Sequence, residues 1–128
     1  MSELLDAIIC LHPFYALEVN LKGDVSTCCP AWSKRMVGNL HKKSLLKIWN
    51  DVPLQNMRRM MLEGRWEKIC RQTCPVIMKY RATGEQTSLA WVRQHVITEE
   101  ILAAVSSRQT VLSTGPTWLN LSNSNICN

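Results

Sequence analysis

Residues 10–29 read CLHPFYALEVNLKGDVSTCC, and this stretch decides the fold. Every second residue from Tyr15 to Leu21 is apolar, which is the pattern of a strand with one buried face. Gly23 follows and can take the positive φ that a tight turn demands. The pattern predicts a β-hairpin over residues 14–29, with its turn at residues 22–24 and a return strand that runs to the adjacent pair of cysteines.

Four of the six cysteines are placed around this hairpin. Cys10 precedes it, Cys28 ends it, and Cys70 and Cys74 follow later in the chain. If Cys70 and Cys74 share a helical segment, their spacing puts both sulfurs on one face. Thiolates that converge from distant segments are what an iron–sulfur cluster or a zinc ion requires. Adjacent strand residues face opposite sides, so we expect Cys28 to face the centre, with Cys29 as its alternative.

The residues leave the identity of the metal open. Four thiolates satisfy a cubane cluster completely, which leaves no iron free for a substrate and favours electron transfer or a structural role. A four-cysteine zinc site usually offers two CxxC pairs, and this chain has none. His12, two residues after Cys10, is read first as a plain surface or core histidine, with a fourth ligand or a hydrogen-bond donor to a sulfur as the alternative.

The rest of the chain predicts an α+β fold, in which a small hairpin is followed by several short helices around a metal centre and a strand-like tail. Residues 30–43 form a polar loop. Pro75 is expected to end or kink a helix. Predicted helices cover residues 45–49 after a Ser44 cap, residues 53–63, residues 66–73, residues 76–95 with a break near Gly84, and a segment after a Thr98 cap; a strand covers residues 118–121.

The composition of the chain indicates its size class and its cellular compartment. The 128 residues are 46% hydrophobic, which suits one domain or one and a half. No apolar run reaches the length of a membrane span, and no basic region precedes Lys22, so we expect neither a membrane protein nor a signal peptide. Six cysteines without an export signal favour metal ligation over disulfides. These features together predict a cytoplasmic protein.

Short motifs between the cysteines occur in a fixed order: Pro13-Phe14, Gly23-Asp24-Val25, Gly38-Asn39-Leu40, Ser44-Leu45, Ile48-Trp49-Asn50, Arg58-Arg59 and Cys74-Pro75. With them, residues 10–75 resemble the SPASM/twitch module, the auxiliary iron–sulfur domain of radical S-adenosylmethionine (SAM) enzymes. The resemblance implies a [4Fe–4S] cluster bound by Cys10, Cys28, Cys70 and Cys74. The family's closing pair is often CxxC, whereas this chain has CxxxC. SPASM members use about seven cysteines for two clusters, so four well-placed cysteines fit the one-cluster twitch form.

The tail from Gly115 to Asn128 resembles the first strand and loop of a radical SAM barrel, with Cys127 as the first cysteine of its cluster motif. We therefore expect residues 1–82 to form the cluster-binding module, residues 83–108 a helical linker, and residues 109–128 the start of a barrel. This reading implies a radical SAM parent enzyme with a second cluster, SAM and a peptide or small-molecule substrate. The fragment alone is not expected to be catalytic, and its tail should be poorly packed or borrowed as an extra strand.

A different class of function is the alternative. The chain carries a net charge of +5, and a zinc-stabilised module of this kind would contact nucleic acid through basic side chains. Because the basic residues are interspersed with apolar ones, a nucleic-acid partner is less favoured than a solvated basic face. No phosphate-binding loop, Ser-His-Asp arrangement or carboxylate pair suggests a catalytic residue. The basic candidates are Lys34, Arg35, Lys42, Lys43, Arg58 and Arg59.

Overall fold

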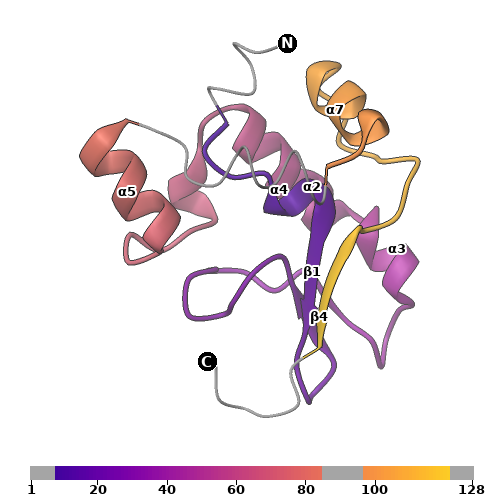
Figure 1. Cartoon of the computed structure of the whole chain (residues 1–128). Coiled ribbons are helices and arrows are strands. Elements are labelled where there is room, and N and C mark those ends of the chain that lie inside the picture. The colour runs from indigo at the N-terminus through magenta and orange to yellow at the C-terminus, as the bar shows by residue number, and fades with distance from the viewer. Residues whose placement is uncertain (1–7, 85–96, 122–128) are drawn as a thin grey trace.

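The computed structural model describes residues 8–84 and 97–121. Its mixed content of short helices and one four-stranded sheet confirms the α+β prediction (Figure 1). The elements in chain order are α2 (His12–Tyr15), β1 (Ala16–Val19), β2 (Asp24–Ser26), β3 (Gly38–Asn39), α3 (Leu45–Trp49), α4 (Val52–Leu62), the 3₁₀-helix η1 (Trp66–Lys68), α5 (Pro75–Thr83), α7 (Glu99–Ser106) and β4 (Trp118–Leu121). Among the helices described, none has the length and apolar character needed to cross a membrane.

The predicted hairpin is present and shorter than expected. Strands β1 and β2 pair in antiparallel fashion, with Val19 opposite Val25, and Gly23 has a φ of +83° in the turn. The first strand begins only at Ala16, because Pro13 starts a helical turn that carries Tyr15. The return strand ends at Ser26, so the adjacent cysteines lie beyond the strand rather than on its two faces. The two-residue strand β3, which falls in the predicted loop, extends the sheet beside β2.

The C-terminal tail supplies the fourth strand. Strand β4 lies parallel to β1, pairing Ala16 with Trp118 and Val19 with Leu121 (Figure 1). The sheet order is therefore β3-β2-β1-β4. The expectation that the tail would be borrowed as an extra strand is correct for these four residues, and all four are exposed.

The segment before β4 is well packed, which corrects the expectation of a loose tail. Leu112 is buried in the core, and its backbone N–H and C=O both bond to the side-chain amide of Asn50, at 2.9 and 2.8 Å. The indole N–H of Trp49 donates to the carbonyl of Thr114 at 2.7 Å. Residues 110–114 are thus anchored to the C-terminal end of α3 through polar contacts, which a hydrophobic pattern in the sequence does not predict.

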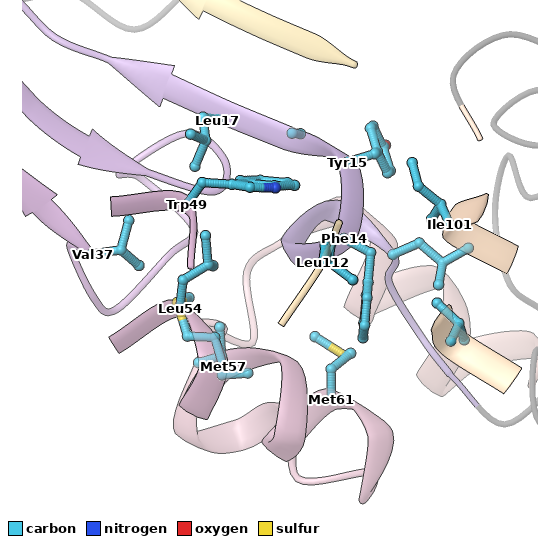
Figure 2. Packing of buried hydrophobic residues seen from close by; sticks show 14 of the residues in the cluster. Phe14, Tyr15, Leu17, Val37, Trp49, Leu54, Met57, Met61, Ile101 and Leu112 are labelled. Atoms are coloured by element: carbon cyan, nitrogen blue, oxygen red, sulfur yellow. The ribbon is translucent and has the colours of Figure 1, made fainter. Parts of the chain in front are cut away.

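The core fills the space between the sheet and helices α4 and α7. Trp49 lies beneath Leu17, and Phe14 points toward Met61 (Figure 2). Helix α4, predicted over residues 53–63, buries an apolar stripe of Leu54, Met57, Met61 and Leu62 in this core. Helix α7 begins at its predicted Thr98 cap and contributes Ile101 and Val105 to the same core. In α3, Ile48 and Trp49 are buried, whereas Leu46 is 69% exposed. The expected helix beyond Gly84 falls in residues 85–96, outside the described ranges.

Arg58 is fully buried. Its guanidinium donates to the carbonyls of Pro13, Trp49 and Thr110 and to the side-chain oxygen of Asn50, at 2.7 to 3.0 Å. It also lies 4.5 Å from the centre of the Trp49 ring. Burial lowers the pKa of Arg58 to about 9, so the group is still a cation at neutral pH. Arg58 therefore joins three chain segments and is unavailable to any surface partner.

Candidate metal centre

Each predicted cysteine is positioned by a different local structure. Cys10 lies just before α2, and the backbone of His12 forms a hydrogen bond with it. Cys28 lies in a bend after β2, and its backbone carbonyl accepts a 2.7 Å hydrogen bond from the Ser26 hydroxyl. Cys70 forms an antiparallel bridge with Ser33, and Cys74 stands at the start of α5.

The expected helix over residues 66–73 is wrong. Only Trp66–Lys68 forms a 3₁₀ turn, and Cys70 then runs in extended pairing beside Ser33. Cys74 is extended, with φ −59° and ψ 128°, because the residue before a proline avoids the helical region. Pro75 accordingly begins helix α5 instead of ending one. The argument that Cys70 and Cys74 share a helix face therefore fails, and a bridge and a cap position them instead.

The thiols of Cys10, Cys28, Cys70 and Cys74 nevertheless lie near one another, and all six pairs interact electrostatically. Burial raises the pKa of the Cys28 thiol to about 12 and that of Cys70 to about 11, and neighbouring thiols add to both shifts. Burial, with the same neighbours, also raises the pKa of Cys10. These four are the free cysteines among the described residues. Cys29 is buried and is not one of the free cysteines.

The described side chains do not form a ready-made site for a single metal ion. Within residues 8–84 and 97–121, no three His, Cys, Asp or Glu side chains are grouped so that they could hold a metal ion. Four thiolates bound to one Zn²⁺ at about 2.3 Å would stand about 3.8 Å apart. In a cubane cluster each thiolate binds a different iron, so the sulfurs are spread over a larger body.

Two aromatic side chains line the site. Burial raises the pKa of the Tyr15 hydroxyl, and Cys10 and Cys28 add to that shift, so the phenol lies near two of the thiols. The His12 ring lies 5.1 Å from the Tyr15 ring, and its Nδ1–H donates to the carbonyl of Thr27 at 3.1 Å. Sequence reasoning missed Tyr15 because its place in the alternating pattern indicated a strand. Pro13 at the start of a helical turn was the signal, since that turn brings residues 12 and 15 together.

Comparison with known families gives a match over the same residues. The SPASM family model, described as an iron–sulfur cluster-binding domain, matches residues 10–75. This stretch covers just over half of the chain and contains all four free cysteines. Neither the curated proteins nor the solved structures give a significant match.

Proposed function

The chain belongs to the SPASM family of iron–sulfur cluster-binding domains, and on this premise we propose that it binds one auxiliary [4Fe–4S] cluster through Cys10, Cys28, Cys70 and Cys74. The observation that carries the proposal is the mutual electrostatic interaction of these four free thiols. They come from three separate parts of the fold, so the tertiary structure has gathered them.

Four free thiols are a donor set that suits a cluster, and the family match favours a cluster over a zinc ion. The described side chains offer no grouping suited to one ion, while the four thiols remain close enough to affect one another. Protonated, buried thiols with raised pKa values need a strongly positive group before they ionise, and the irons of a cluster supply that charge. The chain itself contributes the thiolates, with the buried Tyr15 phenol beside Cys10 and Cys28 and the His12 ring near Tyr15.

The role of the cluster follows from its ligation. A bound cluster supplies a one-electron redox centre, and four protein thiolates leave no iron open to a substrate. Electron transfer or the shaping of a neighbouring active site is therefore the proposed role, within a radical SAM parent that provides the catalytic barrel and binds SAM. The parallel pairing of β4 with β1 agrees with a tail that enters a parallel barrel. Cys127, the proposed start of the SAM-cluster motif, lies outside the described residues.

Anaerobic reconstitution followed by metal and sulfide analysis tests the proposal. We expect about four irons and four sulfides per chain, and a brown protein. Fewer than about two irons with no sulfide would overturn the cluster assignment. One zinc per chain and no colour would support the zinc-stabilised alternative. Two of the basic side chains predicted to contact nucleic acid are already engaged within the chain. Arg58 is buried, and Lys43 forms an ion pair with Asp51.

A further inference from the structure

Two short segments on either side of Cys70 carry a group of exposed cations. One segment is the loop with Lys34 and Arg35, and the other holds Lys68, the last residue of η1, and Arg71. We call these four residues the basic rim. Glu67 is the acidic residue between them, so the rim and Glu67 together carry three net positive charges out of the chain's +5. A local excess of positive charge therefore lies beside one of the proposed cluster ligands.

Hydrogen bonds fix the two segments against each other. Next to the Ser33–Cys70 bridge, the backbone N–H of Lys34 donates to the carbonyl of Ile69 and that of Arg71 to the carbonyl of Trp32, both at 2.7 Å. The rim side chains add two further links. The Lys34 ammonium donates to the Glu67 carbonyl at 2.7 Å, and the Arg35 Nε–H donates to the Lys68 carbonyl at 3.2 Å. The rim is therefore held in place before any partner arrives.

No carboxylate in residues 8–84 or 97–121 forms an ion pair with these cations. In the described parts of the chain, the two ion pairs join Lys43 to Asp51 and Arg65 to Glu63, and neither involves a rim residue. The field of the rim reaches the metal site, since the charge of Lys34 acts on the Cys70 thiol. Cys28 and Cys74 are only partly buried, so the site is not sealed from the surface. An uncompensated positive surface thus adjoins the place where a redox centre is proposed.

We propose that the basic rim docks an acidic electron-carrier protein against the Cys70 side of the cluster. This inference rests on the proposed function. Charge complementarity selects the partner, because an acidic surface meets a preformed set of cations. A carrier docked there would lie beside the cluster that the four cysteines would hold; the partner that gives up one electron would be oxidised and the partner that receives it reduced, with no bond formed or broken. A nucleic acid is less suited, because the rim is short and is interrupted by Glu67.

Binding of an acidic flavodoxin to the reconstituted full chain tests the proposal. The double variant Lys34→Gln/Arg71→Gln should weaken binding about three- to tenfold at low ionic strength, mostly through a slower association rate. The matched control, Lys22→Gln/Lys42→Gln, removes two exposed positive charges near the hairpin turn and should change binding less than twofold. Glu67→Lys should tighten binding by a similar three- to tenfold, a gain that misfolding cannot produce.

Iron and sulfide content is measured in every sample, which separates two kinds of failure. A chain that holds its cluster but binds flavodoxin equally well in all variants overturns the docking site and leaves the proposed function standing. A chain that forms no cluster overturns both. A single-stranded DNA oligonucleotide is measured beside flavodoxin, and tighter, rim-dependent binding of the DNA would overturn the electron-carrier assignment in favour of a nucleic acid.

Discussion

The site of Arg58 and the site of the four free cysteines differ in whether the chain itself stabilises the charged form of a buried group. Around Arg58, three carbonyls and one amide oxygen receive the guanidinium hydrogens, and the Trp49 ring lies beside it. At the cysteine site, burial opposes the ionisation of Cys10, Cys28 and Cys70, and Cys74 lies beside them. In the first region the chain's own atoms stabilise the buried charge. In the second region the thiolates need a positively charged group that the chain does not supply.

The two regions also differ in how they are built. Arg58 belongs to the eleven-residue helix α4, whose apolar stripe is buried in the core. The cysteines lie in a bend, a single bridge and a helix cap. Local structure of this kind has few cooperative contacts, so we expect the Arg58 region to fold without a cofactor and the cysteine region to become rigid with one.

Removal of the whole tail should have the largest effect on the Arg58 region. Deletion of residues 109–128 takes away the Thr110 carbonyl, the buried Leu112 and both of its bonds to Asn50. The loss should be about 5 kcal/mol or more, comparable with the whole stability of a small domain. Chemical denaturation of the purified chain measures it.

The shorter deletion of residues 115–128 is the control for this truncation. It keeps the anchored segment and removes β4 with its exposed Leu119 and Leu121. The remaining chain should stay folded and associate less. If both deletions leave the fold intact, the Arg58 region does not depend on the tail.

Substitution of Arg58 by methionine should have the next largest effect. Methionine keeps an apolar stem beside Trp49 but leaves the carbonyls of Pro13, Trp49 and Thr110 without their donors. We expect a loss of about 3–5 kcal/mol in the free energy of unfolding. Arg59→Met is the matched control, because Arg59 is exposed on the same helix, and it should cost no more than about 0.5 kcal/mol. Equal effects of the two substitutions would contradict the role given to Arg58.

Cluster loading should alter the two regions unequally. Backbone amides of residues 66–74 and 28–35 should exchange with solvent at least about tenfold more slowly after anaerobic reconstitution, since a bound cluster links their segments. Amides in the middle of α4 should change much less. Hydrogen exchange followed by mass spectrometry compares the two forms. A uniform change over the chain would remove the contrast between the regions.

The helix cap at Ser44 should give the smallest effect. The Ser44 hydroxyl accepts a 3.3 Å hydrogen bond from the backbone N–H of Lys47 at the start of α3. Ser44→Ala should cost about 1 kcal/mol and leave the iron content unchanged. Thermal unfolding and iron analysis of the same preparation measure both quantities. A loss of iron in this variant would show that the two regions are more tightly coupled than the structure indicates.

The sequence predicts those parts of the molecule that local chemistry determines. Gly23 marks the turn, Ser44 and Thr98 mark helix starts, and Pro53 lies in the first turn of α4. The helix assigned to residues 66–73 is wrong because pairing of Cys70 with Ser33 overrides local helical spacing. Such pairing is a tertiary effect, and no periodic pattern encodes it.

The candidate site shows the same division. Its four cysteines are recognisable from the sequence, while the bridge and the cap that bring Cys70 and Cys74 to the site are not. The burial of Arg58 was equally hidden, because an Arg-Arg pair in a basic helix looks like a surface feature. Its acceptors come from Pro13, Trp49 and Thr110, which are brought together only by the fold.

Iron retention in two single variants, Cys28→Ser and Cys29→Ser, tests the central claim most directly. Cys29 is disulfide-bonded in the structure, whereas Cys28 is a free cysteine whose thiol interacts with those of Cys70 and Cys74. After anaerobic reconstitution, Cys28→Ser should lose the cluster and most of its iron, while Cys29→Ser should keep about four irons per chain. Loss of iron from Cys29→Ser, with retention in Cys28→Ser, would contradict the assignment of Cys10, Cys28, Cys70 and Cys74 as the cluster ligands.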